Sequence, residues 1–158
     1  MRLFHGTNSP FSEIDLSKSR TNKDFGKGFY LSDTYSQAEE MGAFKAGFLG
    51  GEVIVYEYET DDDILKDTSL NIKVFTSYSE EWANFVLKNR DNSSNEPIHD
   101  YDLVYGPIAD DNVGVQLRKF HKEEITFEEF LKKLKFPKGI TFQYFFATEK
   151  AISKLKRL

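Results

Sequence analysis

The fold of this chain is decided by the stretch Asp24-Phe25-Gly26-Lys27-Gly28-Phe29-Tyr30-Leu31-Ser32-Asp33, which joins a polar loop to a short aromatic strand. Two glycines flank Lys27, so the backbone here is free to adopt conformations that a Cβ atom forbids and to approach a ligand closely. Phe29 and Tyr30 favour a strand and point to its opposite faces, so we expect one ring to pack inward and the other to face a cleft. The stretch predicts half of a nucleotide site, with Leu3–Thr7 as the other half. A tight turn followed by an edge strand would have the same local signature.

The whole chain has the size and composition of one domain, spanning residues 1–158, with a substantial core. It contains no cysteine, which excludes disulfides, thiol catalysis and thiolate metal sites and fits a cytoplasmic protein. We expect no signal peptide after Met1 and no membrane span, because no apolar run approaches about 20 residues. The net charge of -5 argues against a broad nucleic-acid surface. The lysine-rich C-terminal end predicts a solvated face of two short helices.

Hydrophobic periodicity and turn residues predict an irregular mixture of strands and helices. Expected strands cover residues 2–5, 52–59, 101–105 and 140–146, and the ambiguous segment 61–76 suggests two more, at 64–66 and 72–75. Expected helices run from a cap at 34 or 36 to about 44, from 77 or 79 to about 89, from 110 or 111, from a capping box at 126 to a stop at 136–139, and from 149 to 158. Glycines at 47–51 are expected to break the first helix, and residues 90–97 to form a surface loop. Because no regular βαβ alternation occurs, the chain is predicted to be a single α+β domain.

Few residues suggest chemistry by themselves. His5 ends an apolar strand and precedes Gly6, whereas His99 and His121 lie in polar contexts and are expected to be solvated. No second histidine or tight carboxylate cluster accompanies His5, so we expect no metal. The acidic run 61–63 is expected to be a solvated turn. Phosphate-loop, GxGxxG and GxSxG motifs do not occur.

Two separated motifs carry a resemblance. His5-Gly6-Thr7 is followed, about two dozen residues later, by Phe25–Asp33 and then by Ser36-Gln37-Ala38. In order and spacing they resemble the NAD site of the ADP-ribosyltransferase superfamily, including the diphtheria-toxin group and the poly-ADP-ribose polymerases. Further stretches resemble a bacterial, toxin-like branch of that superfamily, so that the similarity covers nearly the whole chain. These stretches are residues 78–82 with 89–90, 101–111, 142–144 and 146–151.

The resemblance implies a single-domain ADP-ribosyltransferase-like α+β fold with two small, mainly antiparallel sheets and peripheral helices around an NAD cleft. It implies that His5 holds a ribose hydroxyl and that the backbone of Gly6 holds the nicotinamide carboxamide. Thr7 and Gly28 fall in the same cofactor-binding motifs. Tyr30 matches the aromatic residue that stacks on nicotinamide, and a tyrosine face is a suitable partner for that cationic ring.

One position departs from the polymerase pattern. Gln143 stands where that pattern has a glutamate on a late strand, and its amide can hydrogen-bond the ribose but carries no negative charge. This argues against chain elongation and leaves mono-ADP-ribosyl transfer open. Glu149 is a fallback, although its position suits a helix-dipole charge. Arg20 and Lys27 are candidates for the pyrophosphate or are solvated, and Tyr35 is a candidate for a second stacking ring.

The resemblance therefore implies an NAD+-dependent mono-ADP-ribosyltransferase, with His5, Tyr30 and Gln143 as its catalytic set and NAD+ as co-substrate. A macromolecule would be the acceptor, with protein favoured by the acidic charge and nucleic acid open. Relatives of this kind look like toxins of toxin–antitoxin pairs, which implies an antitoxin partner. Asp102, Asp110 and Asp111 either orient the acceptor or occupy strand-end and helix-cap positions. Two alternatives remain: a catalytically inactive NAD-binding or partner-binding module, and a structural domain with an accidental resemblance.

Overall fold

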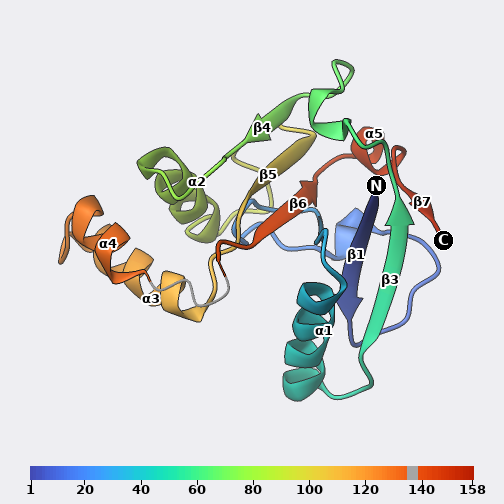
Figure 1. Cartoon of the computed structure of the whole chain (residues 1–158), viewed down its shortest axis with the longest axis horizontal. Coiled ribbons are helices and arrows are strands. Elements are labelled where there is room, and N and C mark those ends of the chain that lie inside the picture. The colour runs from blue at the N-terminus through green and yellow to red at the C-terminus, as the bar shows by residue number, and fades with distance from the viewer. Residues whose placement is uncertain (135–138) are drawn as a thin grey trace.

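A computed structural model describes residues 1–134 and 139–158. In these residues the chain forms an α+β arrangement of two small sheets flanked by helices (Figure 1). The strands are β1 (Arg2–Thr7), β2 (Phe29–Leu31), β3 (Ile54–Glu59), β4 (Ile72–Val74), β5 (Leu103–Pro107), β6 (Phe142–Phe146) and β7 (Lys156–Arg157). The α-helices are α1 (Tyr35–Leu49), α2 (Glu80–Arg90), α3 (Asp111–His121), α4 (Phe127–Lys133) and α5 (Glu149–Ile152), and single 3-10 turns occur at Leu16–Lys18 and Ile64–Lys66.

The strand order is β1-β3-β7 in one sheet and β2-β6-β5-β4 in the other. All of these pairs are antiparallel except β4 with β5. The predicted fold class and the two small, mainly antiparallel sheets are therefore confirmed. No helix in the described part of the chain combines the length and apolarity needed to cross a membrane.

One antiparallel bridge joins the two sheets. The amide of Phe4 donates to the carbonyl of Ser32 (2.7 Å), and the amide of Ser32 donates to the carbonyl of Phe4 (2.8 Å). Beyond this pair β1 and β2 are not paired as strands, so they separate. The separation opens a space between the two sheets on the side of the α1 helix.

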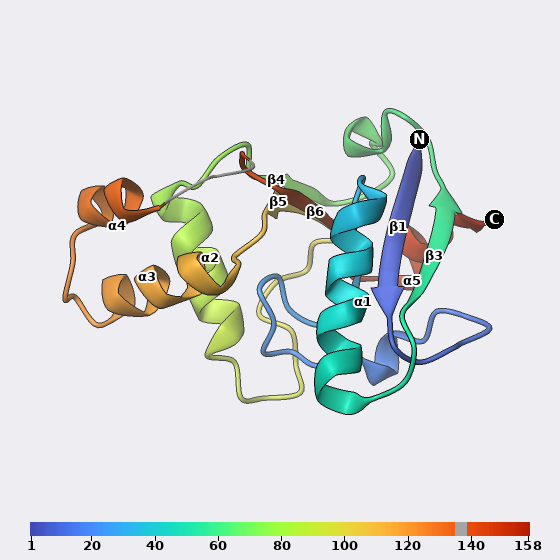
Figure 2. The ribbon, with the colours of Figure 1, turned by 60° about the horizontal axis from the view of Figure 1, so that its bottom comes forward.

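Strand β6 divides the hydrophobic core into two parts. Its residues alternate between the faces of the sheet, as pleating requires. Tyr144 and Phe146 pack between the two sheets, where they join Leu3, Phe29, Leu31, Tyr58 and Leu103. Phe145 faces the other side, in a cluster beneath α2, α3 and α4 that includes Phe25, Trp82, Val86, Leu117 and Phe130. The four-stranded sheet is thus covered on both faces, and Figure 2 shows α2, α3 and α4 lying away from the three-stranded sheet.

Helix α1 lies directly along β1, as both views of the ribbon show (Figure 2). The close approach depends on Gly6, because a Cβ atom there would lie 1.6 Å from the carbonyl oxygen of Ala38. Gly42 makes the matching approach from the helix, since a Cβ there would lie 3.2 Å from the backbone of Thr7. Two glycines therefore set the distance between helix and strand.

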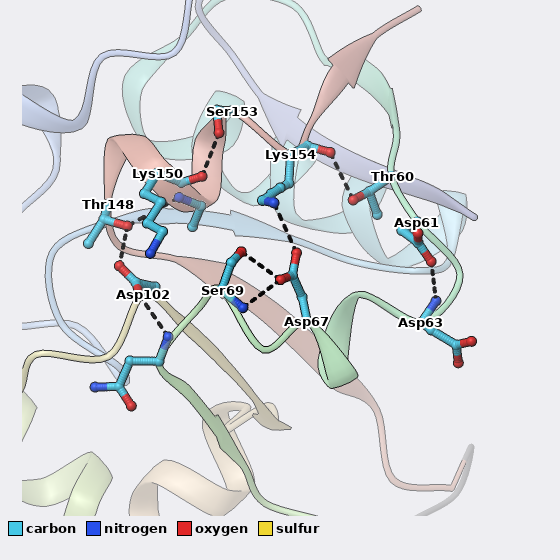
Figure 3. A network of polar contacts seen from close by, with 12 residues as sticks. Thr60, Asp61, Asp63, Asp67, Ser69, Asp102, Thr148, Lys150, Ser153 and Lys154 are labelled. Atoms are coloured by element: carbon cyan, nitrogen blue, oxygen red, sulfur yellow. Dashed lines mark hydrogen bonds and ion pairs between the residues drawn. The ribbon is translucent and has the colours of Figure 1, made fainter.

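Aspartates fasten the C-terminal segment to the rest of the domain (Figure 3). Asp102 accepts hydrogen bonds from the hydroxyl of Thr148 (2.6 Å) and the amide of Asn71 (2.8 Å), and these bonds lower the pKa of its carboxyl group. Asp67 pairs with Lys154 (3.1 Å), and its pKa is lowered to about 2, chiefly by its hydrogen bonds from Ser69. The predicted strand-end role of Asp102 is confirmed.

Several local predictions are confirmed by the cap geometry. Ser79 accepts from the amide of Trp82 at the start of α2, and Asp110 caps α3 by accepting from the amide of Val113. Thr126 forms the expected capping box at α4. The predicted end of α4 at residues 136–139 falls mostly outside the described residues.

Two predictions about helix length are wrong. Helix α1 continues through Gly47 to Leu49 and ends at Gly50, whose φ of 78° favours glycine. The terminal helix ends at Ile152, and β7 then pairs with β3, because the edge of β3 offers unpaired backbone groups to the residues that follow the helix. Residues 64–66 form a 3-10 turn rather than a strand, whereas the strand at 72–75 is confirmed over Ile72–Val74.

A pair of glycine substitutions tests the packing of α1 on β1. Gly6→Ala should lower the free energy of unfolding by about 1–3 kcal/mol, because the new methyl group meets rigid backbone. Gly47→Ala is the control: Gly47 lies in α1 and a Cβ there would meet nothing within 4 Å, so the substitution should raise stability by about 0.5–1 kcal/mol. Urea unfolding measures both, and equal effects of the two substitutions would contradict the packing described.

Candidate functional site

A cavity of about 400 Å³ lies where β1 and β2 separate. Its walls come from these two strands, from α1 and from the loop at residues 22–24, with Ile108 and Gln143 contributed by later parts of the chain. The polar and aromatic-hydroxyl residues that line it are His5, Asn22, Lys23, Asp24, Tyr30, Ser32, Gln37, Lys45 and Gln143. This volume and mixture of side chains are typical of small-molecule sites.

His5 spans the gap between the two strands. Its Nδ1 lies 2.7 Å from the carbonyl oxygen of Tyr30. A carbonyl only accepts, so Nδ1 carries the proton and Nε2 is an acceptor with no hydrogen-bond partner among the residues that the structure describes. The ring also stacks on Phe29, with centroids 4.2 Å apart. His5 is thus held in one orientation and one tautomer.

The environment of His5 keeps it neutral. Burial lowers its pKa from 6.5 to about 4, and the positive charges of Lys45 and Lys23 act in the same direction. The hydrogen bond to the Tyr30 carbonyl opposes this shift without cancelling it. At neutral pH the ring is therefore a hydrogen-bonding group and not a cation.

Tyr30 lines the cavity from β2, while its neighbour Phe29 is buried, which confirms the predicted alternation. Its hydroxyl donates to the carbonyl of Gly26 (2.8 Å) and accepts from the amide of Phe25 (3.1 Å). Burial raises the pKa of this hydroxyl well above its usual value. The Lys23 ammonium lies 5.6 Å from the ring centroid, so a cation already faces this ring.

Gln143 reaches the same cavity from β6. The β2–β6 ladder ends where Leu31 pairs with Tyr144, and Gln143 is the residue of β6 next to that last pair. The Gln143 amide nitrogen is buried and has no hydrogen-bond partner in the described part of the chain. An unsatisfied buried donor costs stability, which makes it a candidate ligand contact.

The glycines of the two motifs have packing and turn roles. Gly6 and Gly28 line the cavity, but their missing side chains serve packing: a Cβ on Gly28 would lie 2.3 Å from the ring of Phe145. Gly26 adopts a φ of 97°, which requires glycine at the turn. The carbonyl of Gly6 accepts from the Lys45 ammonium (3.0 Å), so the free protein already satisfies it internally.

The two lysines of the cavity, Lys23 and Lys45, escaped the sequence prediction. Lys45 lies one turn after Met41 and two turns after Gln37, a helical spacing that would have placed all three on one face of α1. Lys23 and its neighbour Asp24 come from the polar loop that precedes the glycine turn. The Asp24 carboxylate pairs with Arg90 at 2.7 Å, so its charge is already compensated.

Other predicted site residues lie elsewhere. Thr7, Arg20 and Lys27 are not among the residues that line the cavity, and Tyr35 is exposed with its ring edge-on to Phe4. Glu149 lines a separate shallow hollow beside residues 10–15. Among the described residues, no group of three or more histidine, cysteine, aspartate or glutamate side chains could hold a metal ion.

The prediction that His99 is solvated is wrong. Its Nε2 donates to the carbonyl of Phe25 (2.7 Å), and its Nδ1 accepts from the amide of Tyr101 (3.1 Å). These bonds tie the surface loop before β5 to the turn that precedes β2. His121 is exposed, as expected, and lies 3.3 Å from Asp91.

A family model described as "Protein of unknown function (DUF3990)" matches residues 1–157. The chain belongs to this family. No curated protein matches the chain. The match spans both sheets and every residue that lines the cavity.

The buried histidine leads to a prediction about pH. Between its unfolded pKa of 6.5 and its folded pKa of about 4, His5 binds a proton only in the unfolded chain, so stability falls as pH is lowered through this range. Relative to His5→Gln, the wild type should lose about 2 kcal/mol of unfolding free energy between about pH 7 and pH 5. Chemical denaturation at both pH values measures this difference, in which other titrating groups cancel. Parallel pH–stability curves for the two proteins would contradict a buried, neutral His5.

Proposed function

We propose that this protein is an NAD+-dependent mono-ADP-ribosyltransferase that transfers ADP-ribose to a macromolecular acceptor and releases nicotinamide. One observation carries the proposal: His5, Tyr30 and Gln143, from three segments far apart in the chain, line a single cavity. These are the three residues that the resemblance to ADP-ribosyltransferases singles out. On this proposal the space between β1 and β2 is the NAD cleft of an ADP-ribosyltransferase-like fold.

The proposed roles follow from the hydrogen-bonding state of each group. The Nε2 of His5 is a fixed acceptor, suited to a ribose hydroxyl. The Gln143 amide, with its unpaired nitrogen, would take the remaining ribose contact. Tyr30 would present its ring to nicotinamide once Lys23 moves off that ring. Met41, which also lines the cavity, would replace a second aromatic ring with a flexible apolar side chain.

Transfer would break the bond between nicotinamide and C1′ of the ribose. The bonding electrons leave with nicotinamide, which becomes neutral, and positive charge develops on the ribose. The acceptor nucleophile then forms a bond to C1′ and loses its proton to solvent. Such a charge is stabilised best by a nearby carboxylate, and Gln143 offers only an amide dipole. We therefore expect slow, single transfers and NAD+ hydrolysis as a side reaction, and not chain elongation.

A second candidate function is an inactive NAD-binding or partner-binding module. The charges of the cavity favour this inactive module. Asp24 contributes a carboxylate to the lining, but its charge is already neutralised by the ion pair with Arg90. In this case the cavity would bind the dinucleotide without breaking it. Measurable NAD+ binding without nicotinamide release would select this function over transfer.

The biological setting of the proposal rests on the same resemblance. We propose a cytoplasmic toxin or effector, held in check by an antitoxin protein. The net charge of -5 favours a protein acceptor over nucleic acid. Digestion of the labelled product with protease or nuclease would decide between the two.

Labelled NAD+ incubated with the protein and a bacterial lysate tests the proposal. The wild type should release nicotinamide and label a macromolecule, and His5→Gln and Tyr30→Leu should each lower transfer about 10- to 100-fold. Gln143→Glu should raise nicotinamide release, because a carboxylate stabilises the developing charge. Gln116→Glu is its matched control, since Gln116 lies in α3 away from the cavity and also has an unpaired buried amide atom.

Folding of each variant is checked by its thermal unfolding curve. The enzyme proposal fails if folded wild-type protein neither releases nicotinamide nor transfers label. A thermal-shift titration without any response to NAD+ would leave a structural domain as the remaining explanation.

A further inference from the structure

Two ammonium groups in the cavity lack a carboxylate partner. Lys45 donates to the carbonyl of Gly6, and Lys23 lies over the ring of Tyr30, but neither forms an ion pair with any residue in the described parts of the chain. Asp24, the carboxylate in the lining, is bound to Arg90. The charge balance inside the cavity is therefore positive.

The basic groups act on one another, which shows that they are close. The positive charge of Lys23 lowers the pKa of Lys45, and both lysines lower the pKa of His5. Arg20 in turn lowers the pKa of Lys23. Burial is the larger cause for Lys45, whose pKa falls to about 8. Like charges gathered in a partly desolvated space repel, and a bound anion would relieve that repulsion.

The packing of α1 on β1 positions the ammonium group of Lys45 in the cavity. Gly6 and Gly42 let the helix lie against β1, and this brings the ammonium of Lys45 within 3.0 Å of the Gly6 carbonyl at the inner wall. Lys23 comes from the loop at the mouth and remains accessible to solvent. An anion entering the cavity would meet Lys23 first and Lys45 second. The neutral donors Asn22 and Gln37 line the same cavity and can bind further oxygens.

We propose that Lys23 and Lys45 form an oxyanion subsite that binds the diphosphate of the nucleotide. The subsite replaces Arg20 and Lys27, which do not line the cavity, as the source of positive charge for the ligand. The ammonium of Lys23 leaves the Tyr30 ring to meet the phosphate, and this frees the ring face. The proposal rests on the nucleotide site proposed above but not on group transfer, so binding tests it independently of turnover.

Calorimetric titrations with ADP and with adenosine test the subsite. ADP should bind at least about tenfold more tightly than adenosine, and Lys23→Gln and Lys45→Gln should each weaken ADP binding about tenfold while leaving adenosine binding unchanged. Glutamine at position 45 can still donate to the Gly6 carbonyl, so the packing of α1 is retained. Lys88→Gln, an exposed lysine on α2, is the matched control and should change neither affinity.

A pH series compared between the wild type and Lys45→Arg tests the charge of Lys45, because Lys23, whose pKa is lowered by burial and by Arg20, titrates in both proteins. His5, with a pKa of about 4, and the strongly shifted Tyr30 do not change charge above neutrality, and Asp24 stays paired with Arg90. The loss of the Lys45 ammonium as pH rises past about 8 should lower ADP affinity by about tenfold in all, as Lys45→Gln does. Lys45→Arg keeps its charge and should show a flatter profile than the wild type. A purely structural role of Lys45 would give the two proteins the same profile.

The results separate the two proposals. Equal affinities for ADP and adenosine, no binding of ADP, or ADP binding that both lysine variants retain would overturn the subsite, even if the protein transfers ADP-ribose. Lysine-dependent ADP binding without nicotinamide release supports the subsite and counts against transfer.

Discussion

The single bridge between Phe4 and Ser32 is the constraint on which the site depends. If β1 and β2 continued to pair, the two sheets would merge and no cavity would form between them. In an antiparallel pair the backbone groups of alternate residues point the same way, so the Tyr30 carbonyl points toward β1, like that of Ser32. The strands have already parted at this point, and the side chain of His5 supplies the hydrogen bond that β1 does not. His5, which is expected to bind a ligand, therefore also forms a hydrogen bond with a backbone carbonyl at the edge of the four-stranded sheet.

Local signals predicted local structure well. The caps at Ser79 and Thr126 and the alternation of Phe29 and Tyr30 depend on residues a few positions apart, and each was predicted from the sequence. The second half of the C-terminal segment was missed, because its preference for β3 depends on an edge about a hundred residues away in the chain. The convergence of His5, Tyr30 and Gln143 was expected from a resemblance and not from periodicity.

The charged residues that line the cavity were the part of the site that the sequence predicted least well. Arg20 and Lys27 were the predicted candidates for the pyrophosphate, yet the lysines that line the cavity come from residue 23 of the polar loop and from the third turn of α1. The packing role of Gly6 was not predicted: a Cβ at this position would collide with Ala38. The sequence shows which charged side chains the chain contains near the predicted site. Which of them share a cavity depends on how closely a helix and a strand approach.

The hydrogen bonds of His99 couple the local unfolding of two loops. The turn around Phe25 and the loop before β5 are joined by this side chain, and Thr21 adds a bond to the carbonyl of Ser94 (2.6 Å). Neither loop can detach while these bonds hold, so their local unfolding is one cooperative event with one free energy. Their backbone amides should exchange hydrogen with solvent as a single unit, although some seventy residues separate them in the chain.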